Sequence, residues 1–316
     1  MRVVYSQSHI QHHPKLELYD GEPTNMPELP DRIETIRRTL LKRSDITWHE
    51  PMHYPDEIAL AMHDLRYSNY LQTLSHSLEN RSDCIASNYI HDTYAPLTRG
   101  TWQAARSALD MALTGAELLT ELNHPVYVLC RPPGHHAGDS YMGGYCFFNN
   151  AGVAAHTLSQ KGRVSILDID YHHGNGTQQI FYNRNEVQYV SVHANPAHQY
   201  PYTHGFSDEC GVGAGFGYNH NFIVEQHCGW TTYQKALNQA LASVEKYSPD
   251  YLVVSLGFDG YKDDPIAGFG LNIADYSAIA SAIKNLGLPT LLIQEGGYCI
   301  DSLGELADAV VSVFTS

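Results

Sequence analysis

The sequence predicts a single-domain α/β protein in which a mostly parallel sheet lies between two layers of helices, α/β/α. Short apolar runs alternate with helical stretches through the second half of the chain, the pattern of βαβ units. No repeat, low-complexity tract or Ser/Gly linker divides the 316 residues, so we expect one domain over residues 1–316. Hydrophobic residues make up 43% of the chain and charged residues 17%, enough apolar surface for a large core.

The N-terminal part is predicted to begin with a short strand at Val3–Tyr5. Apolar residues then recur at a spacing near 3.6 in Asp31–Arg43 and Pro55–Leu74, which predicts two helices. The segment Ser75–Thr98 is polar and irregular, so we expect it to run over the surface. Thr101–Leu122 carries alanine and leucine on one face and is predicted to be a long helix.

The rest of the chain holds five short, β-rich apolar runs that predict buried parallel strands: Val126–Cys130, Val164–Leu167, Val187–Val192, Tyr251–Leu256 and Thr290–Ile293. Helices are predicted to accompany them at Asn149–Gln160, Thr177–Tyr182, Thr231–Lys246, Ile273–Leu286 and Ile300–Phe314.

Four of these predicted strands are followed directly by polar clusters. RPPGHHAG begins at Arg131, DIDYHHGNG at Asp168, GFDG at Gly257 and QEGGY at Gln294. In open α/β sheets, ligands bind just outside the carboxyl ends of the strands. The four clusters are therefore expected to meet in one site.

The charge balance excludes some classes of partner. The 19 basic and 34 acidic residues give a formal net charge of −15, which argues against a nucleic-acid partner and suits a cationic substrate. The chain has no apolar run of about 18 residues, and its start, MRVVYSQSH, does not resemble a signal peptide. Its six cysteines form no CxxC pair, as is typical of reduced thiols. We therefore expect a cytoplasmic protein without a membrane partner.

The DIDYHHGNG and GFDG clusters indicate a metal site. Asp170 and His172 are two residues apart, so on extended backbone their side chains point the same way. With Asp259 they offer three ligands that suit a divalent transition metal and leave a position open for water or substrate. The alternative is a simple Asp–His hydrogen bond at a strand end. The second strand-end aspartate, flanked by glycines, favours the metal.

Two further clusters hold candidate catalytic side chains. His135 and His136 lie on a loop stiffened by two prolines, and they could divide the roles of general base and electrostatic support. Asp168 and Asn175 are available as their orienting partners. The alternative is a pair of surface histidines, which is how we interpret His12–His13. Tyr298 of QEGGY could donate a hydrogen bond to a developing oxyanion; the alternative is a packed tyrosine after a glycine turn.

The chain carries four long motifs: RPPGHHAGDSYMGGYCFFNNAGVAA, ILDIDYHHGNGTQQIFY, VSLGFDGYKDDPIAGF and IQEGGY. Together they resemble the metal-dependent histone deacetylase superfamily, and most of all its bacterial acetylpolyamine amidohydrolase branch and class II deacetylase-like proteins. The resemblance runs from MRVVYSQSH through LELYDGE to the last predicted helix. It implies the arginase/deacetylase-like α/β fold.

The resemblance also implies catalytic roles. Asp170, His172 and Asp259 match the family's metal ligands, usually for one zinc ion (Zn2+), with Fe2+ or Co2+ as alternatives. His136 matches the general base and acid. The other positions are His135 as its electrostatic partner, Asp168 as the partner of His135, Asn175 where some members have aspartate, and Tyr298 as the catalytic tyrosine.

Substrate and potassium positions follow from the same resemblance. Gly144 matches the residue whose carbonyl receives the substrate amide, and Tyr145 and Tyr200 match the aromatic channel walls, where phenylalanine is more usual. Asp92 matches a rim aspartate, and Glu17 an acidic residue at the channel mouth. Two structural potassium sites (K+) are implied, the first at Asp168, Asp170, His172, Ser191 and Val192, the second at Phe181, Arg184, Val187 and Tyr218.

The expected function is a metal-dependent hydrolase that removes acetyl or other acyl groups from amines. Acetylated polyamines are the favoured substrates, and acetyl-lysine in a protein or peptide is the alternative. The segment Ser75–Thr98 looks shorter than the insertion that narrows the tunnel in the polyamine branch. A shorter segment implies a more open channel mouth, which would allow larger acyl-lysine substrates. A binuclear ureohydrolase would need further carboxylates, and an inactive acyl-amine binding module would be expected to lack a ligand, the tyrosine or a histidine. A homo-oligomer is left open.

Overall fold

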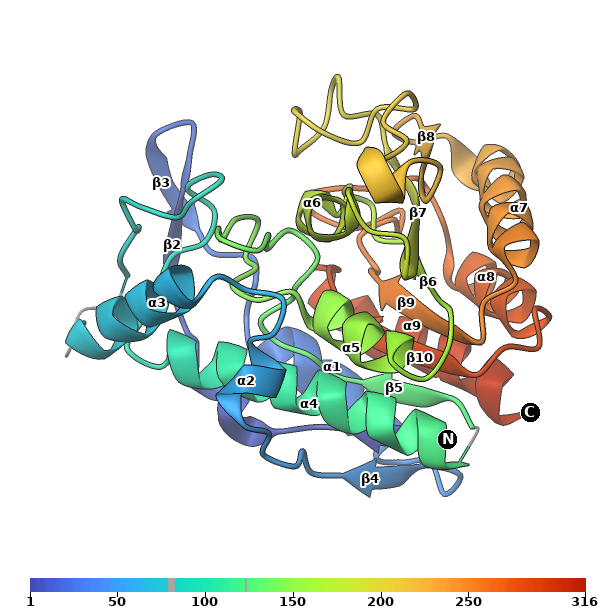
Figure 1. The fold of residues 1–316 in the computed structure, drawn as a ribbon. Helices are drawn as coiled ribbons and strands as arrows, with labels where there is room; N and C mark the ends of the chain where they lie inside the picture. Colours follow the sequence, from blue (N-terminus) through green and yellow to red (C-terminus); the bar gives the residue numbers. More distant parts are fainter. Residues whose placement is uncertain (79–82, 123) are drawn as a thin grey trace.

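The structure is a computed structural model that describes residues 1–78, 83–122 and 124–316. An eight-stranded sheet crosses its centre in the order β4-β1-β5-β10-β9-β6-β7-β8, with every pairing parallel (Figure 1). The strands span Arg2–Val4 (β1), Thr47–His49 (β4), Val126–Val128 (β5), Val164–Asp168 (β6), Val187–Ala194 (β7), Asn219–Val224 (β8), Tyr251–Leu256 (β9) and Thr290–Gln294 (β10). The predicted parallel α/β architecture is confirmed.

Helices cover both faces of this sheet. On one face, α4 (Thr101–Leu122) and α5 (Asn150–Ser159) pack on each other and on the central strands. On the other, α7 (Gly229–Tyr247) lies on β6, β7 and β8, and the layer continues through α8 (Ile273–Lys284) and α9 (Ile300–Thr315). The other helices are α1 (Asp31–Leu40), which packs on α9, α2 (Asp56–Ala59), α3 (Leu65–Ser77) and α6 (Asn175–Phe181). Strands β6, β7 and β10 are buried at every residue, as expected for strands covered on both faces.

Four strands are present where the sequence predicted none. The edge strands β4 and β8 are short or polar, and β8 reads NHNFIV, so neither has the apolar run of a central strand. The other two, β2 (Leu16–Tyr19) and β3 (Glu22–Asn25), form an antiparallel hairpin that stands away from the main sheet (Figure 1). Asp20 and Gly21 join them with φ of 51° and 84°, the positive values that two-residue hairpin turns favour.

Three local predictions were wrong. The helix expected at Pro55–Leu74 is two helices, because the Asp64 side chain accepts backbone hydrogen bonds from Arg66 and Tyr67 and starts α3 afresh. The segment Ser75–Thr98 is not all surface: α3 continues to Ser77, and Leu97 is fully buried. Residues 79–82 of that segment lie outside the described residues. Finally, His12 is buried against Phe147 while His13 is exposed, because neighbouring side chains of extended backbone point to opposite sides.

The strand order explains how the functional clusters come together. β5, β10, β9 and β6 are consecutive neighbours in the sheet, and all four run in the same direction. The polar clusters that follow them therefore emerge side by side at one sheet edge. Among the residues described, none of the helices combines the length and apolarity needed to cross a membrane.

Candidate active site

A cavity of about 150 Å³ opens at this edge of the sheet. His136, His172, Gly144, Tyr145, Tyr200 and Tyr298 line it, so it draws side chains from the segments after β5, β6 and β10. Tyr19, Tyr202 and Ile266 also line the cavity and are largely exposed, which places them at its mouth.

The three predicted metal ligands lie together. One ligand atom from each of Asp170, His172 and Asp259 lies within 4.8 Å of the others. Nδ1 of His172 is 2.9 Å from Oδ2 of Asp259 and 3.5 Å from Oδ1 of Asp170. Two carboxylates and one imidazole are a suitable donor set for a divalent transition metal, and three protein ligands leave a position open.

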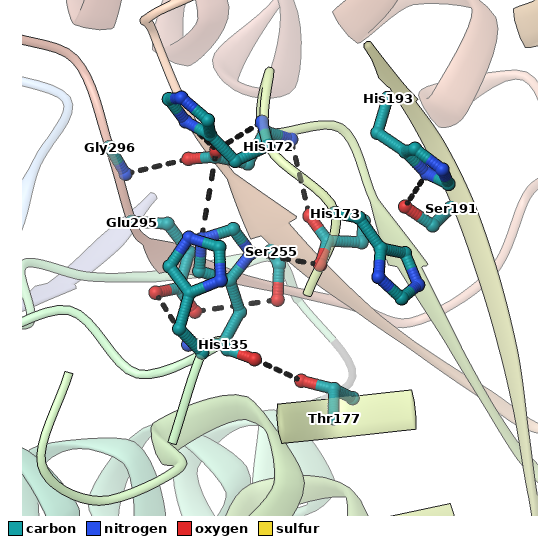
Figure 2. A network of polar contacts seen from close by, with 12 residues as sticks. His135, His172, His173, Thr177, Ser191, His193, Ser255, Glu295 and Gly296 are labelled. Atoms are coloured by element: carbon teal, nitrogen blue, oxygen red, sulfur yellow. Dashed lines mark hydrogen bonds and ion pairs between the residues drawn. The ribbon is translucent and has the colours of Figure 1, made fainter. Parts of the chain in front are cut away.

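The electrostatics of this triad also suit a cation. Asp170 and Asp259 are both buried, and burial together with the charge of Asp170 raises the pKa of Asp259. A divalent cation between them would offset this repulsion. Space for it is kept by Gly296, where a Cβ atom would come within 2.6 Å of Asp170 Oδ2 and 2.7 Å of Asp259 Oδ2. Gly296 also donates its N–H to Asp170 over 2.8 Å (Figure 2). The residues present therefore fit a metal.

Beside the triad, the two histidines have different partners. His135 donates from Nδ1 to Asp168 over 3.1 Å, and His136 donates from Nδ1 to the amide oxygen of Asn175 over 2.7 Å. With its Nδ1 hydrogen placed on Asn175, a neutral His136 ring has an unprotonated Nε2 atom. The ring centroids of His135 and His136 are 3.9 Å apart. Sequence reasoning named Asp168 and Asn175 as the orienting pair, and the structure brings all four together.

The two histidines also differ in basicity. Burial lowers the pKa of His135, but the charges of Asp170 and Asp168 outweigh it and raise that pKa above its ordinary value. His136 is buried too, and it faces positive charge on His135 and His172, so its pKa falls well below the usual value. His136 is therefore a neutral imidazole at neutral pH, the form that can accept a proton.

Glu295, the residue directly after β10, anchors the histidine loop. It is fully buried, and its Oε2 accepts the backbone N–H groups of Gly134 (2.6 Å) and His135 (3.2 Å), while Oε1 lies 3.4 Å from the Ser255 hydroxyl (Figure 2). The loop is also held from α6, because the backbone N–H of Thr177 donates to the carbonyl of His135 over 3.1 Å. Neither Glu295 nor Thr177 was identified from the sequence.

Tyr298 projects into the cavity from the segment after β10 and is only 8% exposed. The Arg32 guanidinium carbon lies 4.7 Å from the centre of its ring, and Arg32 also donates to the carbonyls of Gly297 (2.5 Å) and Glu295 (2.6 Å). The backbone N–H of Tyr298 donates to Asp264 over 2.7 Å. The hydroxyl is thus carried on backbone held by Arg32 on one side and Asp264 on the other.

Arg32 belongs to a buried ionic cluster that joins two of the loops. Oε1 of Glu28 accepts from Arg32 and from Arg131, each over 2.8 Å, and Arg131 opens the RPPGHHAG segment. Burial raises the pKa of Glu28, but the two arginines outweigh it and lower that pKa to about 2. A buried glutamate or arginine in a sequence gives no sign of its partner, so only the fold identifies this cluster.

Each predicted channel tyrosine lies near a carboxylate: Tyr200 near Asp92, and Tyr145 near Glu17, whose charge adds to burial in raising the pKa of Tyr145. The Tyr200 hydroxyl donates to Asp92 over 2.5 Å, and Asp92 also accepts the N–H of Gly144 at 3.1 Å. Asp92 thus supports the channel wall. Glu17 lines the cavity itself and is buried; its Oε1 accepts from Thr24 over 3.4 Å, whereas its Oε2 has no hydrogen-bond partner among the described residues.

The residues predicted for potassium fall into two neighbourhoods. Asp168 and Ser191 are paired across β6 and β7, and Val192 also lies in β7. Asp170 and His172 follow the end of β6 within four positions. In the second neighbourhood, the carbonyl of Phe181 accepts from Arg184 over 3.0 Å, and that of Tyr218 accepts from Tyr189 over 2.9 Å, near the start of β7 at Val187.

Comparisons with known proteins agree with this geometry. Residues 26–314 match the model of the histone deacetylase domain. Acetylpolyamine amidohydrolase 1 of Pseudomonas aeruginosa is 40% identical over 331 aligned positions, which cover 96% of each chain. Acetylpolyamine amidohydrolase of Mycoplana ramosa is 36% identical, again with 96% of each chain covered. The crystal structure of an acetylpolyamine aminohydrolase from Burkholderia pseudomallei superposes with a TM-score of 0.96 at 32% identity, over 100% of this chain and 99% of the other. The protein belongs to the histone deacetylase family.

Proposed function

We propose that this protein hydrolyses the amide bond of acetylated polyamines, releasing acetate and a free amine, with zinc held by Asp170, His172 and Asp259. One observation carries the proposal: the cavity lined by His172 of this triad is also lined by the buried Glu17 carboxylate, whose Oε2 is unpartnered among the described residues. Such a cavity combines amide chemistry with a counter-charge for an ammonium group. The similarity to acetylpolyamine amidohydrolases over nearly the whole chain supports the same conclusion.

The chemistry is divided between the metal and the side chains. A divalent metal at the triad would polarise the acetyl carbonyl and lower the pKa of the attacking water. His136 holds its Nδ1 hydrogen on Asn175 and so presents the Nε2 lone pair to the proton of the water. The same Nε2 atom then gives that proton to the departing amine. His135, held by Asp168, provides electrostatic support beside it.

Tyr298 stabilises the charge that develops on the carbonyl oxygen. Its hydroxyl is a hydrogen-bond donor, its side chain lines the cavity, and Arg32 beneath the ring strengthens that donor electrostatically. Gly144 lies so close to His136 that a Cβ atom would be 2.4 Å from the imidazole. Because its N–H already donates to Asp92, its carbonyl, which accepts from the Cys146 thiol over 3.3 Å, is the main-chain group that would receive the substrate amide.

Glu17 and the aromatic walls select the amine. A linear acetylated polyamine carries a distal ammonium group, and a buried carboxylate with a free oxygen is a suitable partner for it. Tyr145 and Tyr200 line the same cavity as Glu17 and His172 and would enclose the methylene chain. We further propose potassium at the two neighbourhoods of Asp168 and Phe181, where it would have a structural role.

Turnover of matched substrates tests the proposal. The zinc-loaded protein should give a higher kcat/KM for acetylputrescine, acetylcadaverine and acetylspermidine than for an acetyl-lysine peptide. A reversed order would assign the site to the alternative, a peptide deacetylase. The Asp259→Ala variant serves as the control for contaminating activity. Failure of the zinc-loaded protein to release acetate from every one of these compounds would refute the proposed function.

A further inference from the structure

Asp264, which holds the backbone of Tyr298, has unusual surroundings. Its side chain is 8% exposed, and its Oδ2 accepts the backbone N–H groups of Tyr298 over 2.7 Å and Cys299 over 3.3 Å. Its Oδ1 accepts the N–H of Ile266 over 3.1 Å. One carboxylate therefore satisfies three main-chain donors from two segments that are about thirty residues apart.

The segment around Tyr298 depends on such an external acceptor. Helix α9 begins at Ile300, and its N-cap residue, Cys299, makes no side-chain cap hydrogen bond. The preceding Gly297 has φ of 114°, so the chain turns sharply just before Tyr298. The unsatisfied N–H groups at the start of a helix favour a negative charge, and Asp264 supplies it from another loop.

The loop that carries Asp264 also borders the cavity. Its ends are joined, because Tyr261 and Leu271 form a β-bridge and the N–H of Lys262 donates to the carbonyl of Leu271 over 2.8 Å. Two residues after Asp264, Ile266 lines the cavity and is 39% exposed. Asp264 thus ties one wall of the mouth to the backbone of Tyr298.

From these contacts we infer that Asp264 is a positioning residue for the Tyr298 hydroxyl, linking the mouth loop 261–271 to the oxyanion donor. The inference rests on the proposed function. It does not make Asp264 a group that touches the substrate. It predicts that loss of the carboxylate misplaces the Tyr298 hydroxyl and slows turnover, while the metal triad and the Glu17 side of the cavity stay as they are.

A double-mutant cycle tests this directly. In the zinc-loaded protein, Asp264→Ala should lower kcat for acetylputrescine by roughly 10- to 100-fold, because a small misplacement of a reacting group is costly. KM should change by less than about threefold, and zinc content should match the wild type. In the Tyr298→Phe background, Asp264→Ala should cause no further loss, because the hydroxyl that it positions is already absent.

Two companion variants sharpen the result. Asp264→Asn should lower kcat less than Asp264→Ala does, since its one carbonyl oxygen can still accept the Tyr298 N–H. If Asp264→Ala does not fold, Asp264→Asn replaces it in the double-mutant cycle, and the expected effect is smaller. Asp263→Ala is the matched control, because the neighbouring Asp263 side chain is 62% exposed and pairs only loosely with Lys262, at 3.9 Å. It should leave kcat unchanged.

Hydrogen–deuterium exchange separates this inference from the proposed function. The Asp264→Ala variant should exchange faster than the wild type in peptides that cover residues 296–303, whatever substrate the protein uses. If kcat falls by the same factor in the Tyr298→Phe background as in the wild type, or exchange at residues 296–303 is unchanged, Asp264 does not position Tyr298. If the wild type is inactive on acetylputrescine but exchange responds as expected, the proposed substrate is wrong and the structural link stands.

Discussion

His136 donates its Nδ1 hydrogen to the amide oxygen of Asn175 over 2.7 Å, whereas the neighbouring His135 donates to the carboxylate of Asp168. An amide oxygen fixes the ring without placing a negative charge beside it. His136 therefore stays a weaker base than His135, and burial next to positive neighbours lowers its pKa further. The two adjacent histidines are thus given different protonation states by their partners.

Replacing this amide by a carboxylate should change the pH dependence of the reaction. In Asn175→Asp, the new charge stabilises the His136 imidazolium and raises its pKa, so the neutral base is present only at higher pH. The acid limb of the kcat/KM profile should shift upward by about 1 pH unit or more. The measurement is kcat/KM between pH 5 and 9 for the variant and the wild type. An unshifted acid limb would show that another group is the base.

Removal of a proposed metal ligand should abolish zinc binding and activity together. Asp170→Ala and Asp259→Ala each delete one of three protein ligands, and the remaining pair forms a weaker site. Elemental analysis after dialysis should find much less zinc than in the wild type, and acetate release should be lost. The exposed Asp263, changed to alanine, is the matched control. Full zinc occupancy in either triad variant would disprove the ligand assignment.

The free Oε2 of Glu17 predicts a preference for substrates with a distal charge. Acetylputrescine should be a better substrate than N-pentylacetamide, a neutral amide of similar length, and Glu17→Gln should remove most of that difference. The Glu22→Gln variant is the control, since Glu22 is exposed on the same hairpin. The ratio of kcat/KM for the two compounds is the readout. Equal ratios in wild type and Glu17→Gln would exclude Glu17 from ammonium recognition.

His63 predicts a loss of stability in mild acid. Its Nδ1 donates to the carbonyl of Gly138 over 3.0 Å, and its Nε2 accepts the N–H of Asn149 over 2.9 Å, so only the neutral ring fits. Burial accordingly lowers its pKa to about 4. The unfolded chain binds this proton near pH 6.5 and the folded protein only near pH 4, so the free energy of unfolding should fall between those values by about 3 kcal/mol.

Urea denaturation at pH 7, 5.5 and 4.5 tests this contribution. His63→Gln retains an acceptor for the Asn149 N–H but has no proton to bind. The difference in the free energy of unfolding between this variant and the wild type should therefore become smaller as the pH falls. His76→Gln, at an exposed position of α3, should follow the wild type at every pH. If the His63→Gln variant is less stable than the wild type by the same free energy at all three pH values, protonation of His63 does not cause the loss of stability in acid.

The sequence alone predicted the central strands and the polar clusters that follow their carboxyl ends. This was possible because β5, β6, β9 and β10 are continuous apolar runs, each followed directly by a polar motif. The order of these strands in the sheet depends on crossover connections and is not encoded in any local pattern. Local pattern also missed β8, whose polar residues face other side chains at the sheet edge.

The supporting residues of the site could not be predicted for a related reason. Arg32 binds the carbonyl of Gly297, 265 positions away, and Asp264 binds the N–H of Tyr298 from a different loop. A single buried charge gives no sequence signal for a partner that only the fold brings near. The site residues that could be named from sequence were those clustered in motifs; the residues that hold them are scattered singly along the chain.

Turnover by the Tyr298→Phe variant tests the central claim most directly. The substitution keeps the ring that lies on Arg32 and removes only the hydroxyl that faces the cavity. With acetylputrescine and the zinc-loaded protein, kcat should fall by about 100- to 1000-fold, equivalent to about 2.7–4 kcal/mol of activation free energy, while zinc content and substrate Kd stay near those of the wild type. A variant that turns over acetylputrescine at nearly the wild-type rate would contradict the account, because Tyr298 would then be a packing residue.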